Sequence, residues 1–250
     1  MKIGITGCKG RVGSILVQEI LSGHWKGVEL SGGTVLPGEN TDATYFVTDD
    51  ADELFQKSDV VIDFTVPVAT REHIRLAAHH GKGLVIGTTG LSPEDDASIK
   101  EAAKKTRIVQ SANMSLGVNL LLALVEQAAS KLGPDWDIEI FEAHHKHKID
   151  SPSGTALALG NAAAQGRGKA PFAAIDRAGK RKDGEIGYAV TRGGDVVGEH
   201  TVYFYGEGER IELSHIATNR ALFARGAIKA AQWVNGQKPG LYSLKDVLGL

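Results

Sequence analysis

The feature that most constrains this chain is a glycine-rich turn, GCKGRVG, which spans Gly7–Gly13. An apolar segment with strand character, Lys2–Thr6, precedes it, and Arg11–Ser22 follows with its apolar residues at helical spacing. Glycines at such a junction let the backbone approach a pyrophosphate, and the free N–H groups at the helix start attract its charge. The motif reads GxxGxxG rather than GxGxxG, so a glycine-rich turn without a ligand stays open as the alternative.

The first half of the chain alternates between apolar strands and helices. The predicted strands are Lys2–Thr6, Val28–Val35, Val60–Thr65, Leu84–Gly87 and Arg107–Gln110, and the predicted helices are Arg11–Ser22, Asp50–Lys57, Thr70–His80 and Pro93–Lys105. This alternation is typical of a doubly wound parallel sheet, in which ligands bind at the carboxyl ends of the strands. Two further loops, Gly87–Gly90 and Ala112–Ser115, follow strands of this sheet, although each taken alone is compatible with a simple turn.

The second half has a different pattern. Helices are predicted over Val118–Leu132 and Asn219–Val234, and strands over Trp136–Glu142, Ile186–Thr191, Val196–Tyr205 and Arg210–His215. Alternating polarity and hairpin-like turns favour an antiparallel or mixed sheet here. The segment 166–184, rich in Gly, Lys and Arg, is expected to be the least ordered.

The second strand carries no acid where dinucleotide-binding domains usually hold the adenosine ribose, about 20 residues beyond the glycine turn. Glu29 comes too early for this role, and Glu39 follows a Pro–Gly turn. Lys9 and Arg11 place two cations in the glycine turn, where they can meet a 2′-phosphate or simply be solvated. We therefore predict that NADPH is accepted, with or without NADH.

The segment from Glu142 to Ala156, EAHHKHKIDSPSGTA, gathers five basic-capable side chains before a helix start. Ser153 is a natural N-cap, and the free N–H groups after it form an anion site beside the basic cluster. Three interpretations stay open from the residues alone: a solvated basic loop, a metal site built from His144, His145 and His147, or a site for anion binding and proton transfer. Histidine is suited to the last, because its ordinary pKa lies near neutrality.

Bulk properties exclude several classes of function. The formal net charge is −2, which gives no reason to expect nucleic acid or a membrane surface as partner. Apolar runs such as Val118–Val125 are far shorter than the roughly 20 residues that span a bilayer, and no signal peptide is expected. Cys8 is the only cysteine, so no intrachain disulfide can form, which fits the cytoplasm.

The segment Glu142–Ala156 resembles the signature of the dihydrodipicolinate reductase family, E-x-H-H-x-x-K-x-D-x-P-S-G-T-A, and meets it at every fixed position. The resemblance extends over essentially the whole chain, through Gly7–Gly13, Asp63-Phe64-Thr65, Gly87–Gly90, Asn113-Met114-Ser115, Arg192–Thr201 and the tail from Asn219 to Leu250. The chain departs from several relatives at Val35 and Leu36, where an acid and an arginine often stand near the adenosine ribose.

The resemblance implies an α/β fold with a Rossmann-type dinucleotide-binding domain, residues 1–115 completed by 217–250. It also implies an α+β domain with a mixed sheet, residues 116–216, that binds substrate and builds a homotetramer. It implies His144 and Lys148 as proton-transfer residues. Substrate-binding residues would be His145, Ser153, Gly154 and Thr155, and coenzyme-binding residues would be Gly7, Cys8, Lys9, Gly10, Arg11, Val12, Gly87, Thr88, Thr89, Ala112, Asn113, Met114 and Ser115.

The implied activity is reduction of a small cyclic dicarboxylate, 4-hydroxy-tetrahydrodipicolinate, by NADPH or NADH in diaminopimelate and lysine biosynthesis, without a metal. Two other classes of function are alternatives. A different NAD(P)-dependent dehydrogenase of a small amino or dicarboxylic acid would share the first domain but not the His/Lys and Ser-Gly-Thr segment. A non-enzymatic NAD(P) sensor would not need an intact proton-donor segment, which this chain keeps.

Overall fold

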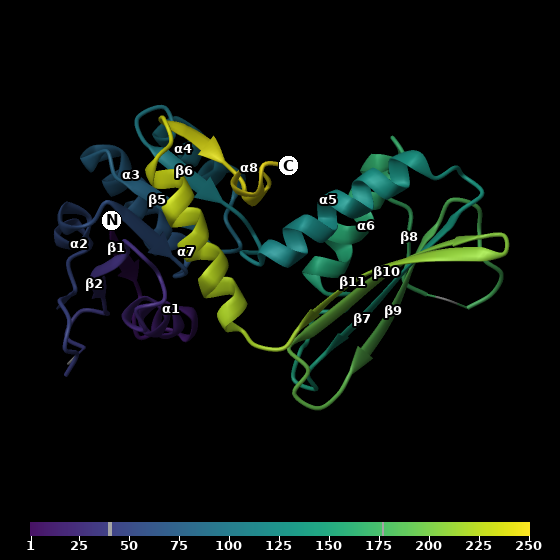
Figure 1. The fold of residues 1–250 in the computed structure, drawn as a ribbon, viewed down its shortest axis with the longest axis horizontal. Coiled ribbons are helices and arrows are strands. Elements are labelled where there is room, and N and C mark those ends of the chain that lie inside the picture. The colour runs from purple at the N-terminus through teal and green to yellow at the C-terminus, as the bar shows by residue number, and fades with distance from the viewer. Residues whose placement is uncertain (40–41, 177) are drawn as a thin grey trace. The chain divides into compact units, whose positions relative to one another are not determined.

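The computed structural model describes residues 1–39, 42–176 and 178–250. Within these residues the chain forms two compact units, Met1–Leu116 with Ala221–Leu250, and Gly117–Arg220. The first unit therefore holds both ends of the chain, and Figure 1 shows it with both the purple and the yellow ends of the colour scale.

The first unit is built on a sheet with the strand order β12-β6-β5-β4-β1-β2-β3 in the described part of the chain. Its strands are β1 (Lys2–Thr6), β2 (Glu29–Thr34), β3 (Val47–Thr48), β4 (Val60–Asp63), β5 (Gly83–Ile86), β6 (Arg107–Gln110) and β12 (Gly240–Tyr242). All the pairings between them are parallel. The chain moves outward from β1 to β3 and then returns to the other side of β1, which places the topological switch point between β1 and β4.

Helices cover both faces of this parallel sheet. They are α1 (Arg11–Leu21), α2 (Ala51–Lys57), α3 (Pro67–His80), α4 (Pro93–Ala102), α7 (Ala221–Asn235) and α8 (Leu244–Leu248). Successive residues of a strand face opposite sides, so Ile62 packs with α1 and α7 in one core cluster while Val61 packs with α2, α3 and α4 in the other. This arrangement confirms the predicted doubly wound sheet and its completion by the C-terminal tail.

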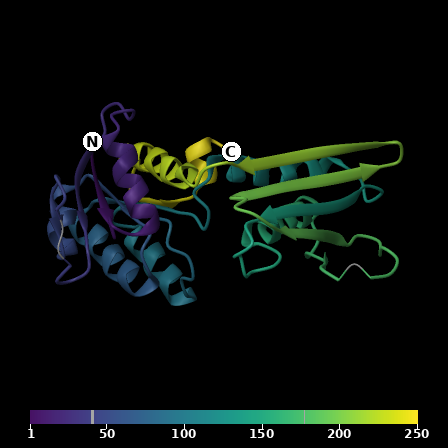
Figure 2. The same ribbon diagram turned by 90° about the horizontal axis from the view of Figure 1, so that it is seen from below.

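The second unit carries a mixed sheet with the order β11-β10-β7-β9-β8. Its strands are β7 (Asp137–His144), β8 (Ala173–Ala174), β9 (Ile186–Arg192), β10 (Gly198–Gly206) and β11 (Glu209–Ala217). β9 pairs in parallel with β7 and β8, whereas β10 pairs antiparallel with β7 and β11. The long β10–β11 hairpin is plain in Figure 2. The mixed sheet confirms the prediction for this half.

Helices α5 (Leu116–Lys131) and α6 (Gly154–Gly166) pack on the mixed sheet and close its core. The contact is close at Gly160 of α6, where a Cβ would lie 1.8 Å from the Tyr188 hydroxyl. A glycine is therefore required for the helix to approach the strand at this point. None of the helices in residues 1–39, 42–176 and 178–250 combines the length and the apolar character needed to cross a membrane.

Candidate active site

The glycine turn forms a tight loop between β1 and α1. Gly7 has a φ of +65°, which favours glycine, and Gly10 donates its N–H to the Gly7 carbonyl at 2.8 Å. Gly13 lies so close to the turn that a Cβ there would be 2.1 Å from the Gly7 oxygen. Each of these glycines therefore has a steric reason to be present, and the turn holds the first residues of α1 directly beneath it.

The start of α1 has the properties of a pyrophosphate site. Its N-cap is Gly10, which has no side chain to cap the helix, and the first turn carries no acid. The N–H groups and the positive end of the helix dipole thus fit a phosphate ligand. Lys9 and Arg11 are exposed, whereas Cys8 is buried against Gly33, so only the backbone of Cys8 can serve a ligand.

The other predicted coenzyme residues follow neighbouring strands. Because β1, β4, β5 and β6 are parallel, the loops after them gather at one edge of the sheet. At that edge Thr89 and Ala112 are exposed and Thr88 is buried. Met114 points into the core, and its carbonyl lies where a Cβ on Gly226 of α7 would be only 1.7 Å away. Met114 can therefore offer only its backbone to a ligand.

A buried carboxylate organises two of these loops. Asp63, the last residue of β4, is fully buried and accepts hydrogen bonds from the Thr65 hydroxyl at 2.6 Å, the Thr70 hydroxyl at 2.7 Å and His73 Nδ1 at 2.8 Å. Burial alone would raise the pKa of Asp63, but His73 and the hydroxyl donors hold it below its usual value. Asp63 is thus an ionised anchor beneath the edge.

The same network reaches the loop after β5. The Thr65 N–H donates to the Thr88 hydroxyl at 3.1 Å, and the Thr88 and Thr70 hydroxyls share a hydrogen bond at 2.9 Å. Thr88 was predicted from the resemblance alone, whereas the structure gives its side chain a reason to be threonine. It ties the Gly87–Gly90 loop to the loop after β4.

The basic segment begins at the end of β7, where Glu142 is fully buried. Its carboxylate pairs with His144 Nδ1 at 2.5 Å, accepts the Ser153 N–H at 2.9 Å, and accepts two hydrogen bonds from Arg192, each at 2.8 Å. Burial would raise the pKa of Glu142, but Arg192, His144 and Ser153 lower it below its usual value. Glu142 therefore links the ends of β7 and β9 to the start of α6.

His144 is fixed in one tautomer by this carboxylate. Since an ionised carboxylate can only accept, Nδ1 carries a proton and Nε2 is the nitrogen left for proton exchange. Burial lowers the pKa of His144, and this outweighs the raising effect of Glu142. The ring packs edge-on against His200 at 5.0 Å, and a Cβ on Gly198 would lie 3.0 Å from Nε2. Gly198 thus leaves the room that the reactive nitrogen needs.

Lys148 and His145 lie on the turn that follows β7. The Lys148 ammonium is 2.8 Å from a carboxylate oxygen of the exposed Asp150, and hydrogen bonding from Lys148 lowers the pKa of that carboxyl. The turn is held by the Lys148 N–H, which donates to the His145 carbonyl at 3.1 Å. Since Asp150 is at the surface, a carboxylate ligand can compete with it for the ammonium group.

Helix α6 begins at the predicted cap. Ser153 Oγ accepts the Ala156 N–H at 3.2 Å and shares a hydrogen bond with His200 Nε2 at 3.0 Å. Gly154 is exposed and has open space where a Cβ would stand, and its backbone N–H is hydrogen-bonded to the exposed carboxyl of Asp150. The helix start and His144 are therefore held by the same carboxylate, Glu142.

A pocket beside this segment is strongly basic. His145, Lys146 and His147 line it together with Gly194, Asp195 and Arg220. The loop carrying the basic residues is pinned there by the Lys146 N–H, which donates to the Gly194 carbonyl at 3.2 Å. Within the described residues no three histidine, cysteine or carboxylate side chains converge as a metal-binding group. The residues around the pocket fit an anion.

Four residues that lie in this cluster or line its pocket were not among the predicted site residues: Glu142, Arg192, His200 and Arg220. Glu142 was recognisable in principle, because it stands two residues before His144 and therefore faces the same side of β7. Arg192 and His200 lay within a segment that was noted only for its resemblance. Neither periodicity nor spacing indicates that β9 and β10 would carry them to His144.

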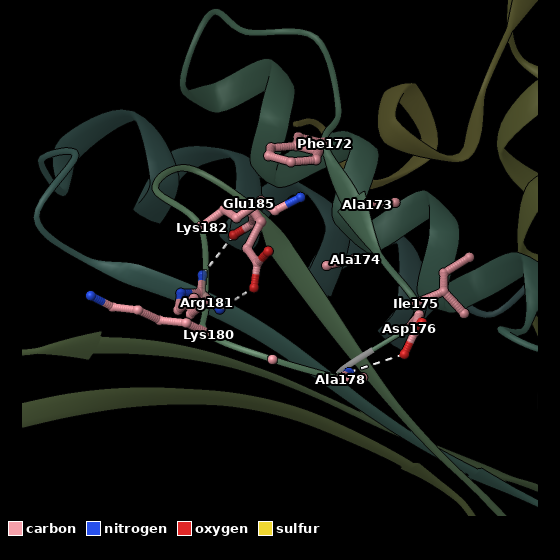
Figure 3. Close-up of a pocket in the computed structure, with 11 residues that line it drawn as sticks. Phe172, Ala173, Ala174, Ile175, Asp176, Ala178, Lys180, Arg181, Lys182 and Glu185 are labelled. Carbon is pink, nitrogen blue, oxygen red and sulfur yellow. Dashed lines mark hydrogen bonds and ion pairs between the residues drawn. The ribbon is translucent and has the colours of Figure 1, made fainter.

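A further pocket of the second unit contains none of the predicted site residues. Phe172, Ala173 and Lys180 line one part of it, and Arg181 points toward Glu185 within it (Figure 3). The Arg181 guanidinium is also paired with Asp137 and Glu139 on β7. Its charge is thus satisfied by three acids.

Comparison with known proteins places both halves of the chain in one family. Family models described as dihydrodipicolinate reductase, N-terminus, and dihydrodipicolinate reductase, C-terminus, match residues 1–114 and 117–248. The chain is 49% identical over 255 residues to the 4-hydroxy-tetrahydrodipicolinate reductase of Zymomonas mobilis, covering 100% of this chain and 98% of that one. It is also 49% identical over 269 residues to the enzyme of the same name from Brucella abortus, covering 100% and 99%.

Comparison with solved structures agrees with this family assignment. A dipicolinate-bound dihydrodipicolinate reductase from Paenisporosarcina sp. TG-14 superposes with a TM-score of 0.85 at 25% identity, over 98% of each chain. A probable dehydrogenase from Thermotoga maritima, at a TM-score of 0.63 and 12% identity over 99% of this chain and 92% of that one, shares the fold. On the strength of two family models, full-length relatives and the complete basic signature, this chain belongs to the dihydrodipicolinate reductase family.

Proposed function

We propose that this chain catalyses the reduction of 4-hydroxy-tetrahydrodipicolinate to tetrahydrodipicolinate by NADPH or NADH, a step of diaminopimelate and lysine biosynthesis. The observation that carries the proposal is the buried carboxylate of Glu142, which holds the proton-transfer histidine and the anion-binding helix start in one cluster. The full-length relatives that carry this enzyme name support the choice of substrate.

Substrate binding rests on positive charge that is available to a dicarboxylate. One carboxylate would bind at the N-terminus of α6, at the backbone of Gly154 and Thr155. There it would replace the exposed carboxyl of Asp150, which receives the Gly154 N–H. The imidazole of His145 and the ammonium of Lys148 are placed on the neighbouring turn for the other charges of a dianionic ring. Asp150 holds Lys148 until a ligand competes for it, so the cation is kept in place without being neutralised by a buried partner.

Proton transfer is assigned to His144 and Lys148. Reduced nicotinamide, when bound, would supply a hydride, and the 4-hydroxyl group of the ring would leave as water. The two changes together consume one proton, which the protein must deliver. His144 is neutral at pH 7 in the free protein, because its pKa is lowered by burial. A bound dianion favours the protonated ring, with Glu142 stabilising the imidazolium through Nδ1. Lys148 holds a proton at Nζ for the same transfer, and Arg192 keeps Glu142 ionised throughout.

Coenzyme binding is assigned to the loops at the edge of the parallel sheet. The glycine turn and the start of α1 would hold the pyrophosphate through backbone N–H groups. Thr88 and Thr89 would position the nicotinamide half, together with the backbone of the segment 112–115. This assignment explains why Cys8 and Met114 can be buried although they stand in the coenzyme loops.

The enzyme is further proposed to work in the cytoplasm as a homotetramer. The single cysteine, Cys8, is buried and forms no intrachain disulfide, which is compatible with a reducing compartment. The face of the mixed sheet that α5 and α6 leave uncovered carries Tyr205 and Ile216, exposed at 40% and 64%. Apolar side chains on an uncovered sheet face are typical of subunit contacts. Light scattering on a size-exclusion column tests the assembly, and a monomer at micromolar concentration would contradict it.

One assay tests the proposed activity. The product of dihydrodipicolinate synthase is supplied with NADPH or NADH, and absorbance of the reduced nicotinamide is followed. Consumption of the coenzyme that requires both the chain and the substrate is the expected result. Equal rates with and without the synthase product would overturn the proposal, and the rates with the two coenzymes show which of them is preferred.

A further inference from the structure

The end of β2 is the place where this fold reads the adenosine ribose of a dinucleotide. β2 ends at Thr34, and the next residues are Val35 and Leu36, neither of which can accept a hydrogen bond through its side chain. By sequence position alone this chain has lost the ribose-binding acid. The structure shows a carboxylate at the same place, supplied from further along the chain.

The chain reverses at Pro37-Gly38, where Gly38 has a φ of +76°. The reversal is closed by the Glu39 N–H, which donates to the Leu36 carbonyl at 3.0 Å, and by the Leu36 N–H, which donates to Glu39 Oε2 at 3.2 Å. The carboxylate of Glu39 is therefore folded back onto the residue where the missing acid would have stood.

The other oxygen of this carboxylate faces the glycine turn. Glu39 Oε1 lies 3.6 Å from the ammonium of Lys9, and 38% of each side chain is exposed. An ion pair at this level of exposure is weak, because water solvates both partners. A ligand that brings its own hydroxyls or its own charge can therefore replace either partner without a large penalty.

We propose that Glu39 and Lys9 act as an opposed pair that sets the coenzyme preference of this chain, an inference that rests on the proposed function. A carboxylate accepts hydrogen bonds from the 2′- and 3′-hydroxyls of NADH but repels a 2′-phosphate. An ammonium attracts the 2′-phosphate of NADPH and gains nothing from a free diol. Glu39 thus favours NADH and Lys9 favours NADPH, and the chain accepts both.

The test uses ligands that carry the adenosine end without the nicotinamide. Binding of ADP-ribose and of 2′-phospho-ADP-ribose to the free protein is measured by titration calorimetry. Glu39→Gln is expected to shift the ratio of the two dissociation constants by about fivefold toward the phosphorylated ligand, and Lys9→Met by a similar factor the other way. The double variant should return the ratio close to that of the original chain.

Glu29→Gln serves as the matched control, because Glu29 is an exposed acid at the opposite end of the same strand. An unchanged ratio in Glu39→Gln, with both ligands still bound, would overturn the Glu39–Lys9 assignment and leave the proposed function standing. Failure of both ligands to bind the original chain would overturn the proposed coenzyme site as well as the Glu39–Lys9 assignment. Both substituted side chains are at the surface, so the fold itself is not at risk.

Discussion

Asp63 and Glu142 are both fully buried near the end of a strand, and each accepts a hydrogen bond from Nδ1 of a histidine. Their other partners differ. Asp63 is surrounded by threonine hydroxyls and backbone N–H groups, with His73 also buried. Glu142 is held by the guanidinium of Arg192 and by the backbone N–H at a helix start.

The difference indicates two uses of the same arrangement. His73 lies on α3, where its neighbours have structural roles only. The pair that it forms with Asp63 therefore holds loops in place. The ring of His144 reaches the candidate active site, and a full positive charge from Arg192 offsets the buried carboxylate when the ring loses its own proton. If His144 exchanges a proton as proposed, the second cation beside Glu142 compensates the change in charge, and the Asp63–His73 pair, for which no proton exchange is proposed, lacks such a partner among the contacts of the described residues.

The largest effect is expected from Glu142→Ala. Removing the carboxylate leaves Arg192 uncompensated and frees both His144 and the Ser153 N–H. Loss of one partner of a buried pair costs about 3–5 kcal/mol of unfolding free energy. Urea denaturation measures this cost. Glu207→Ala, in the exposed β10–β11 turn, is the control, and equal stabilities of the two variants would contradict the role of Glu142.

If Glu142→Ala does not fold, Glu142→Gln keeps the volume of the side chain and separates chemistry from folding. An amide can still accept one hydrogen bond but cannot stabilise an imidazolium. Turnover should fall by about 10²-fold or more while coenzyme affinity is kept. A weakened coenzyme affinity with normal turnover would mean that the two carboxylates do not differ as argued.

Lys148→Ala is expected to rank next. On the proposed function it removes both a cation that binds substrate and a proton donor, so turnover should drop by about 10²- to 10⁴-fold and the KM for the dicarboxylate should rise. Coenzyme affinity should not change, because the proposed coenzyme-binding loops lie in the other unit. Steady-state kinetics and coenzyme titration check both statements, with Lys131→Ala at the end of α5 as the control. Normal turnover in Lys148→Ala would remove this residue from the reaction.

A third prediction concerns acid stability. Burial and the nearby charge of His144 lower the pKa of His200 to about 4. An unfolded chain titrates near 6.5, so it binds more protons than the folded one between these values. The contribution to stability is complete above pH 6.5 and is lost as the pH falls toward 4, by about 3 kcal/mol at most.

Replacement of this residue tests the assignment. His200→Gln should flatten the dependence of unfolding free energy on pH between 6.5 and 4, measured by urea denaturation at several pH values. His147→Gln, at an exposed position in the same unit, should leave the slope unchanged. The same slope in both variants would show that another group, such as His144, is responsible for the acid sensitivity.

Most of the fold follows from local patterns. The long strands and helices of the first half have apolar spacings that are unambiguous, and Ser92 and Asp95 form the capping box that starts α4 where the sequence indicated it. Elements of two or three residues, such as β3, β8 and β12, were not predicted. They are too short to show a period of two, and they exist only because a neighbouring strand supplies hydrogen bonds.

The residues of the candidate site likewise divide into those with a local sequence signal and those without one. The glycine turn, the basic cluster and the Ser153 cap are contiguous in sequence, and so they could be predicted. Arg192 and His200 approach His144 only through the register of β7 with β9 and β10, which pairs His144 with Arg192 and Glu142 with His200. Glu39 was dismissed because it follows a turn, yet that turn brings it back to Leu36. Residues that act through tertiary pairing carry no local signal.

The smallest effect is expected from Asp63→Asn, which tests the loop-fixing half of the comparison. The amide keeps one acceptor but sets an N–H group against His73 or Thr70, at a cost of about 1–3 kcal/mol. Thr65 and Thr88 should then be held less firmly, so coenzyme affinity should weaken several-fold while binding of a dicarboxylate inhibitor is unaffected. Calorimetric titration with each ligand separates the two, and Asp49→Asn, an exposed acid of the same unit, is the control. A loss of dicarboxylate binding equal to the loss of coenzyme binding would show general softening of the protein rather than a role in fixing these loops.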